Sequence, residues 1–201
     1  ISRRRQKHRC TQTRQSLAYR GGQLQTGKSV LIHAGAGGVG SFAIPLAKAV
    51  VAYVFTTCSE RSIALPKSLG ADRVIDYQKE DYAAVIEKET DGAGVDLVLD
   101  TIGGDTIERS FTILKPSGRL VSIVDIPQPQ NLLAAWDKNV TLHFVFATQY
   151  GAKLERLREL IERGQIRPVI DSVLPLTEVA KAHEKLQQGG VRDKIIREPG
   201  V

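Results

Sequence analysis

The sequence predicts an α/β fold in which a doubly wound parallel sheet is covered by helices on both faces. Two observations support this prediction. From Lys28 onward, short apolar runs alternate with amphipathic stretches of helix length. The apolar runs are also nearly continuous, which is typical of strands buried on both faces of a parallel sheet. Strands and helices that alternate in this way form right-handed βαβ units, so a Rossmann-type sheet is expected.

The first part of the chain holds five expected strands and the helices between them. The strands are expected at 30–32, 53–55, 74–75, 97–99 and 120–124. The helices are expected at 39–50, 61–69, 81–89, 105–114 and 130–138. Pro45 and Pro66 fall inside two of these helices, where a proline costs about 3 kcal/mol unless it lies near the first turn or a kink.

After Asn139 the pattern changes. A strand rich in β-branched and aromatic residues is expected at 140–146, followed by an amphipathic helix at 153–163 that ends at Gly164. An extended piece at 168–170, a helix capped by Thr177 and a last strand at 194–196 complete the chain. We therefore expect a basic tail at 1–22, a dinucleotide-binding domain at 23–147 and a C-terminal extension at 148–201.

The positive charge of the chain is concentrated at its start. The net charge is +6, but residues 1–20 contain seven lysines and arginines and no acid, which leaves 21 basic and 22 acidic residues in the rest. A neutral body argues against a nucleic-acid-binding protein. We expect the basic segment to be a solvated, disordered tail, with weak polyanion contact or a transit peptide as the alternatives.

Cysteine content and hydropathy indicate the compartment. Cys10 and Cys58 are the two cysteines, which form neither a disulfide framework nor a metal-binding spacing. No apolar run approaches the roughly 20 residues that a membrane span requires. We therefore expect a cytoplasmic protein without a bound metal and without membrane or nucleic-acid partners.

A glycine-rich motif follows the first expected strand and opens the first expected helix. Gly35, Gly37 and Gly40 give the pattern G-x-G-x-x-G. The first glycine permits a tight turn, the second lets the backbone approach a pyrophosphate, and the third lets the helix lie close to the strand. The alternative is a glycine-rich turn in an ordinary βα unit. The context favours a phosphate-binding loop formed by Gly35, Ala36, Gly37, Gly38, Val39 and Gly40.

The residues after the second expected strand bear on the choice of dinucleotide. NAD-binding domains commonly carry an acid about 20 residues beyond the glycines, where it binds the ribose 2′-hydroxyl. Here the strand end is neutral, and Ser59 and Arg61 are able to bind a 2′-phosphate. This favours NADPH, although Glu60 keeps NADH open as the alternative.

Motifs along most of the chain resemble a known family. They are GAGGVG at 35–40, LAK at 46–48, KSLGAD at 67–72, VIDY at 74–77, DLVLDTIGG at 96–104, KPSGRLV at 115–121, GQIRPVI at 164–170 and AH at 182–183. From about residue 23 to 197 the chain resembles the zinc-independent, quinone oxidoreductase-like branch of the medium-chain dehydrogenases/reductases. The resemblance implies NADPH-dependent reduction of quinones or α,β-unsaturated carbonyls without a catalytic zinc.

The resemblance also implies where the cofactor lies. Ser59, Arg61 and Tyr77 would surround the 2′-phosphate, and Ile102 belongs to a matched motif and is expected in the cofactor site. The nicotinamide would be bordered by Val124, Asp125, Phe144, Val145 and Phe146.

No catalytic residue is assigned, because the cofactor carries the hydride chemistry. His33, His143 and His183 are candidate proton donors, with core or surface roles as the alternative. Asp100 and Asp125 follow strand ends, where they would either bind ligand or cap loops.

Assembly and activity are further expectations. The family implies a homodimer through the edge strand 140–146, for which a proline at Val145 is a probe. A catalytic domain precedes the glycine loop in this family, whereas about 27 residues precede the first strand here, so we expect most of the substrate pocket to be absent. A non-catalytic NADPH-binding module or partner subunit is the alternative to an enzyme, and nucleic-acid binding through the tail is a third.

Overall fold

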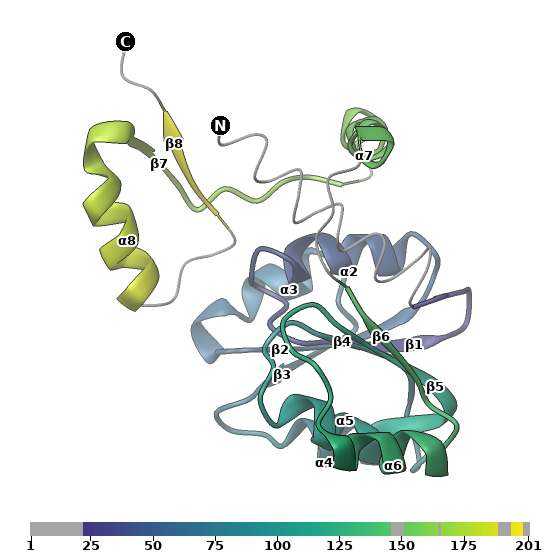
Figure 1. The fold of residues 1–201 in the computed structure, drawn as a ribbon. Helices are drawn as coiled ribbons and strands as arrows, with labels where there is room; N and C mark the ends of the chain where they lie inside the picture. Colours follow the sequence, from purple (N-terminus) through teal and green to yellow (C-terminus); the bar gives the residue numbers. More distant parts are fainter. Residues whose placement is uncertain (1–21, 146–150, 165, 189–193, 199–201) are drawn as a thin grey trace.

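A computed structural model describes residues 22–145, 151–164, 166–188 and 194–198. Six strands form one sheet in the order β3-β2-β1-β4-β5-β6, and every pair in it is parallel (Figure 1). This confirms the doubly wound parallel sheet predicted from the apolar runs. Phe146 and nearly all of the expected basic tail lie outside the described residues.

The strands and helices alternate along the chain as predicted. The strands are β1 (Ser29–Ile32), β2 (Tyr53–Cys58), β3 (Arg73–Asp76), β4 (Val95–Asp100), β5 (Leu114–Ser122) and β6 (Thr141–Phe144). The helices between them are α2 (Gly40–Lys48), α3 (Ala64–Ser68), α4 (Tyr82–Glu89), α5 (Thr106–Ile113) and α6 (Pro129–Asp137). Helices α2 and α3 cover one face of the sheet, and α4, α5 and α6 cover the other (Figure 1).

The core lies on both faces of the central strands. Val30 and Ile32 of β1 pack with Phe42 and Ile44 of α2, whereas Leu31 packs on the opposite face, where α4 and α5 lie. All three β1 side chains are fully buried. Burying a leucine or isoleucine side chain contributes roughly 1.5–3 kcal/mol, which explains why an uninterrupted apolar run forms a central strand here.

Two expected elements differ from the structure in instructive ways. The helix expected at 61–69 is divided into a 3-10 turn, η2 (Glu60–Ser62), and the short α3, in which Pro66 lies in the first turn. A first-turn amide has no intrahelical acceptor, so the proline costs little there. Strand β5 begins at Leu114 rather than at 120, because Leu114 already pairs with Val95 of β4, and the register then shifts before Leu97 pairs with Arg119.

The C-terminal residues form α7 (Gly151–Glu162) and a separate two-stranded parallel sheet of β7 (Ser172–Pro175) and β8 (Ile195–Glu198). Gly164 has a φ of 68°, as a residue that ends a helix requires. The extended piece expected at 168–170 is not part of a strand, and the strand of this region, β7, begins at Ser172. The expected cap Thr177 lies inside a 3-10 turn, η3 (Leu176–Glu178), that precedes α8 (Val179–Gln188).

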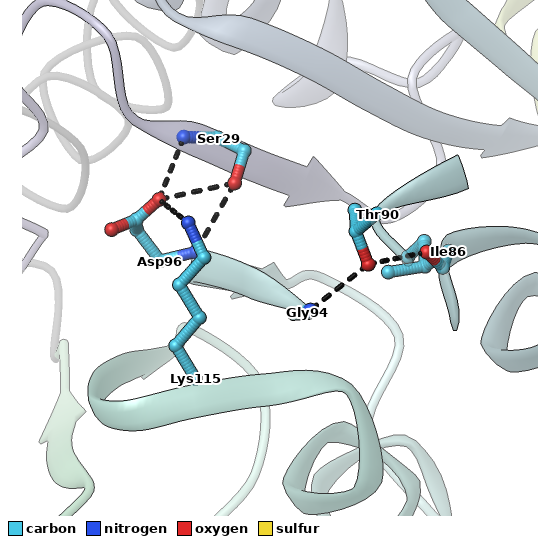
Figure 2. Close-up of polar contacts among 6 residues, drawn as sticks. All are labelled: Ser29, Ile86, Thr90, Gly94, Asp96 and Lys115. Atoms are coloured by element: carbon cyan, nitrogen blue, oxygen red, sulfur yellow. Dashed lines mark hydrogen bonds and ion pairs between the residues drawn. The ribbon is translucent and has the colours of Figure 1, made fainter. Parts of the chain in front are cut away.

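Side-chain hydrogen bonds to Asp96 join β1, β4 and β5. Asp96 Oδ2 accepts hydrogen bonds from the Ser29 amide at 3.0 Å, from Ser29 Oγ at 3.1 Å and from Lys115 Nζ at 2.9 Å (Figure 2). Nearby, Thr90 Oγ1 accepts from the Gly94 amide at 2.9 Å and donates to the Ile86 carbonyl, which ties the end of α4 to the start of β4 (Figure 2). Partial burial opposes ionisation of Asp96, but these hydrogen bonds outweigh it and lower its pKa.

We expect Asp96→Asn to destabilise the fold by about 1 kcal/mol at pH 7, because the amide loses the charge-assisted bond with Lys115. A lowered folded-state pKa stabilises the protein above the ordinary aspartate pKa, and this stabilisation is lost as the pH falls through the folded-state value. The difference between parent and variant in urea unfolding should therefore shrink below about pH 4. An equal difference at pH 3 and pH 7 would contradict the assignment.

Candidate functional site

The candidate site lies at the carboxyl ends of the strands, around the point where β1 and β4 adjoin. Here the chain leaves β1 for one face of the sheet and leaves β4 for the other, which is where open α/β sheets bind ligands. The glycine loop joins β1 to α2 at this point. Ala34 starts the loop with a φ of 51°, so the left-handed residue of the turn is an alanine and not Gly35.

The three motif glycines are required for different reasons. A Cβ on Gly35 would lie 2.1 Å from Thr56 Oγ1, and a Cβ on Gly40 would lie 2.4 Å from the Ala34 carbonyl oxygen. The fold itself therefore demands both glycines. A Cβ on Gly37 would lie 3.2 Å from that same carbonyl oxygen and otherwise only within 3.9 Å of Ala34 Cβ. The fold leaves almost enough room for a Cβ at Gly37. The lack of a side chain there therefore keeps the space outside the loop open.

The start of α2 offers unused hydrogen-bond donors. The loop closes on itself through Gly37 N to the Ala34 carbonyl at 2.9 Å, and no side chain caps the helix. The amides of Gly38, Val39 and Gly40 donate to no acceptor among the described residues. Free amides and the positive end of the helix dipole form an anion site, so this loop fits a pyrophosphate.

A small cavity of about 280 Å³ adjoins this loop. It is lined by Ala34, Gly37, Gly38, Val39, Gly40, Thr101, Ile123 and Val124. Five of the expected cofactor residues are thus brought together, with Val124 on the side that the resemblance assigns to nicotinamide. No ionisable side chain is among these lining residues.

A larger cavity of about 750 Å³ continues from Ala34 toward the end of β3. It is lined by His33, Ala34, Thr57, Tyr77, Gln78, Lys79, Glu80, Asp81, Tyr82, Ile102, Thr106 and Arg109. Tyr77 and Ile102 were both expected in the cofactor site, and both are exposed here. The two cavities share Ala34, and both lie at the carboxyl ends of the strands, where doubly wound sheets bind dinucleotides.

The ends of β2 and β3 carry the residues expected around a 2′-phosphate. Cys58 pairs with Asp76 in the last register position, so the chain after each strand starts at the same edge. Ser59 is half-buried and Arg61 is exposed. Among the described residues no carboxylate pairs with Arg61, whereas Glu60 accepts a hydrogen bond from Lys79 at 2.5 Å.

Two buried polar side chains adjoin the larger cavity. His33 packs edge-on against Tyr82 with ring centroids 4.9 Å apart, and Arg109 lies 4.4 Å above the Tyr82 ring. Burial lowers the pKa of His33 to about 4, although Asp100 opposes this shift, and burial raises the pKa of Tyr82 to about 12. His33 is therefore neutral at pH 7, which makes it a poor candidate for the proton donor.

The two candidate aspartates both cap loops. Asp100 is fully buried, and its Oδ1 accepts from the amides of Ile102 and Gly103 at 3.0 Å, while its Oδ2 accepts from Ser122 Oγ at 2.7 Å. Asp125 Oδ2 accepts from the Gly104 amide at 3.1 Å. Of the two roles considered for these acids, the structure favours capping, which fixes the loop that carries Ile102.

The remaining expected residues lie elsewhere. Ala36 is buried against Cys58 and Val74, and Phe144 and Val145 pack on opposite faces of the sheet. Neither Phe144 nor Val145 is among the described residues that line the two cavities. His143 is half-buried on β6, and His183 is exposed on α8.

Sequence patterns missed several residues at the site. Thr101 and Lys79 line the cavities because they follow the ends of β4 and β3, a position that the strand-end rule could have indicated. Lys194 donates to the Gly38 carbonyl at 3.1 Å and lies 4.4 Å above the Phe42 ring. It brings a cation from the C-terminal segment to the glycine loop, and no local pattern signals this contact.

The described part of the chain holds neither a metal-binding cluster nor a reactive thiol. No cluster of three or more histidine, cysteine or acidic residues there could hold a metal ion. Burial raises the pKa of Cys58 to about 11, with Asp76 as a second cause, so this thiol is unreactive at neutral pH. Within the same described residues, no helix has the length and apolarity that crossing a membrane would take.

Known proteins are similar to this chain in fold and sequence. The family described as zinc-binding dehydrogenase matches residues 69–196. The mitochondrial NAD(P)H oxidoreductase RTN4IP1 of Danio rerio is 34% identical over 191 residues, covering 84% of this chain and 48% of that protein. The quinone oxidoreductase from Coxiella burnetii is 34% identical with a TM-score of 0.83, covering 94% of this chain and 58% of that one. The CurK enoyl reductase is 29% identical with a TM-score of 0.81, covering 95% of this chain and 60% of that one.

The chain spans about half the length of the curated relative that it matches. The matched residues run from just before β3 through α8 and into β8. The chain therefore belongs to the zinc-binding dehydrogenase family, in the quinone oxidoreductase-like branch of the medium-chain dehydrogenases/reductases.

Proposed function

We propose that this chain is the cofactor-binding part of an NADPH-dependent oxidoreductase that delivers hydride to a quinone or an α,β-unsaturated carbonyl. The observation that carries the proposal is the set of three free amides at the start of α2, beside Gly37, where the fold leaves almost enough room for a Cβ. The names of the similar proteins, an NAD(P)H oxidoreductase, a quinone oxidoreductase and an enoyl reductase, support the reaction class.

Each part of the site has a role in this proposal. The bound cofactor would supply the hydride. The amides of Gly38, Val39 and Gly40 would hold the pyrophosphate, Ile123 and Val124 would form an apolar wall at the nicotinamide end, and Tyr77 and Ile102 would border the adenosine. The residues of the smaller cavity bind and orient rather than exchange protons, since no ionisable side chain lines it.

A binding module without turnover is the second candidate. It is favoured by the lining of the smaller cavity, in which the described residues supply backbone, a threonine and apolar side chains but no proton donor. The two candidates are separated by titrating the purified chain with NADPH and NADH and then measuring quinone-dependent oxidation of NADPH. We expect tight NADPH binding and slow quinone reduction, because the described residues do not orient an acceptor. Absence of binding to either dinucleotide would refute both candidates.

Zinc independence, the preference for NADPH and a cytoplasmic location stay predictions. The location is tested by fractionation, because the similar RTN4IP1 protein is named as mitochondrial. We also propose that the chain forms a homodimer through β6.

Arg61→Ala should narrow the difference in affinity between NADPH and NADH. Arg61 has no carboxylate partner in the described part of the chain, so its guanidinium is free to bind a 2′-phosphate. A charge-assisted hydrogen bond contributes roughly 1.5–3 kcal/mol, so NADPH affinity should fall about tenfold or more while NADH affinity stays unchanged. Calorimetric titration measures both constants. Arg163→Ala, which removes an exposed arginine after α7, is the matched control. Equal losses of affinity for NADPH and NADH would exclude a contact between Arg61 and the 2′-phosphate.

A further inference from the structure

The turn after β3 is held rigidly beside the turn after β2. Asp76 is buried, and its Oδ1 accepts from the Gln78 amide at 3.2 Å. Its carbonyl oxygen accepts from the amides of Lys79 at 3.0 Å and Glu80 at 2.9 Å. The backbone position of Lys79 is therefore defined relative to the end of β3, at the rim of the larger cavity that Lys79 lines.

An ion pair connects the two turns. Lys79 Nζ lies 2.5 Å from Glu60 Oε1, and the two side chains are 60% and 64% exposed. The hydrogen bond with Glu60 also raises the pKa of Lys79. Glu60 is the acid that would otherwise be available to a ribose at the end of β2, and Arg61 follows it directly. With Glu60 paired to Lys79, the exposed cation of Arg61 is left without a carboxylate partner among the described residues, while the carboxylate of Asp76 is buried at the end of β3.

We propose that Lys79 is a specificity-determining residue, which binds Glu60 and withholds its carboxylate from the adenosine ribose. This inference rests on the proposed function, since it assigns the choice between NADPH and NADH at the same site. A carboxylate beside the ribose accepts a hydrogen bond from the 2′-hydroxyl of NADH and repels the 2′-phosphate of NADPH. Lys79 therefore selects NADPH by holding away a carboxylate that would select NADH.

The direction in which the NADH affinity changes distinguishes this role from a general effect of the lysine charge. Both cofactors are anions, so a lysine that acted only through its charge would strengthen the binding of both. A lysine that restrains Glu60 weakens the binding of NADH, because it removes the acceptor for the 2′-hydroxyl. Removal of Lys79 should then lower the affinity for NADPH and raise the affinity for NADH.

The experiment is a set of calorimetric titrations with NADPH and NADH. The proteins are the parent chain, Lys79→Ala, Glu60→Gln and the double variant, with Lys88→Ala on the exposed side of α4 as the control for loss of a positive charge. We expect Lys79→Ala to weaken NADPH binding about tenfold and to tighten NADH binding about threefold, the size of modest hydrogen-bond and ion-pair effects. The double variant should regain NADPH affinity to within about twofold and should show no gain for NADH.

Two results would overturn the inference. Weaker or unchanged NADH binding in Lys79→Ala would show that Lys79 does not restrain Glu60. A double variant as weak toward NADPH as Lys79→Ala would make Lys79 a direct phosphate ligand instead. Failure of the proposed function is distinguishable from both, since the parent chain would then bind neither cofactor.

Discussion

Replacing Gly37 by valine should abolish dinucleotide binding while the protein stays folded. A Cβ at this position meets only the Ala34 carbonyl oxygen at 3.2 Å and the Ala34 Cβ at 3.9 Å, so we expect the loop to accommodate it by a shift of a few tenths of an ångström. The rest of the side chain would occupy the space over the free amides of Gly38, Val39 and Gly40. Loss of two or more charge-assisted hydrogen bonds, each contributing roughly 1.5–3 kcal/mol, should lower NADPH affinity more than about a hundredfold.

Gly40→Val is the matched comparison. Its Cβ would lie 2.5 Å from Gly35 Cα as well as 2.4 Å from the Ala34 carbonyl oxygen, and both atoms are backbone. We expect this variant to unfold at a lower temperature, whereas Gly37→Val should melt close to the parent in circular dichroism. Parent-like NADPH affinity in a folded Gly37→Val protein would remove the basis of the proposed function.

The sheet could be predicted from the sequence because its strands are buried on both faces. A run such as Val30-Leu31-Ile32 is apolar at every position only if both sides are covered, as the structure shows. Strand β7 was missed for the opposite reason. The β7 residues alternate between half-buried and exposed in a two-stranded sheet. The strand also begins with Ser172 and ends with Pro175, so the sequence has no continuous apolar run there.

The site was predictable where it depends on local backbone chemistry. The glycine loop follows from G-x-G-x-x-G between a strand and a helix, although the structure moves the left-handed conformation to Ala34. Contacts between distant loops could not be predicted. The Lys79–Glu60 pair spans 19 residues and the Lys194–Gly38 contact spans 156, and neither leaves a periodic pattern. For Asp100 the sequence allowed two roles, and only its hydrogen bonds distinguish them.

The protein should form a homodimer in which β6 pairs with its own copy. Strand β6 is an edge of the six-stranded sheet, as expected from its place in the chain, and among the described residues it pairs only with β5. Helix α6 immediately precedes it and exposes Leu133 and Trp136, which are 70% and 79% accessible. An unpaired edge strand preceded by a helix with exposed apolar side chains is suited to association, and a two-fold pairing closes at two chains.

The structure changes the variant that tests this dimer. The Val145 amide donates to the Ser122 carbonyl at 3.0 Å, so a proline at Val145 would break the internal ladder to β5 rather than the outer edge. Amides of alternate residues point to the same side of a parallel strand, so the Leu142 amide points outward. Leu142→Pro removes that outer donor and should convert a dimer of 22.0 kDa chains into monomer, measured by light scattering at micromolar concentration. Leu142→Ala loses the same half-buried side chain but keeps the amide, and it should stay dimeric. A parent chain that is monomeric, or a dimer that survives Leu142→Pro, would place the interface elsewhere.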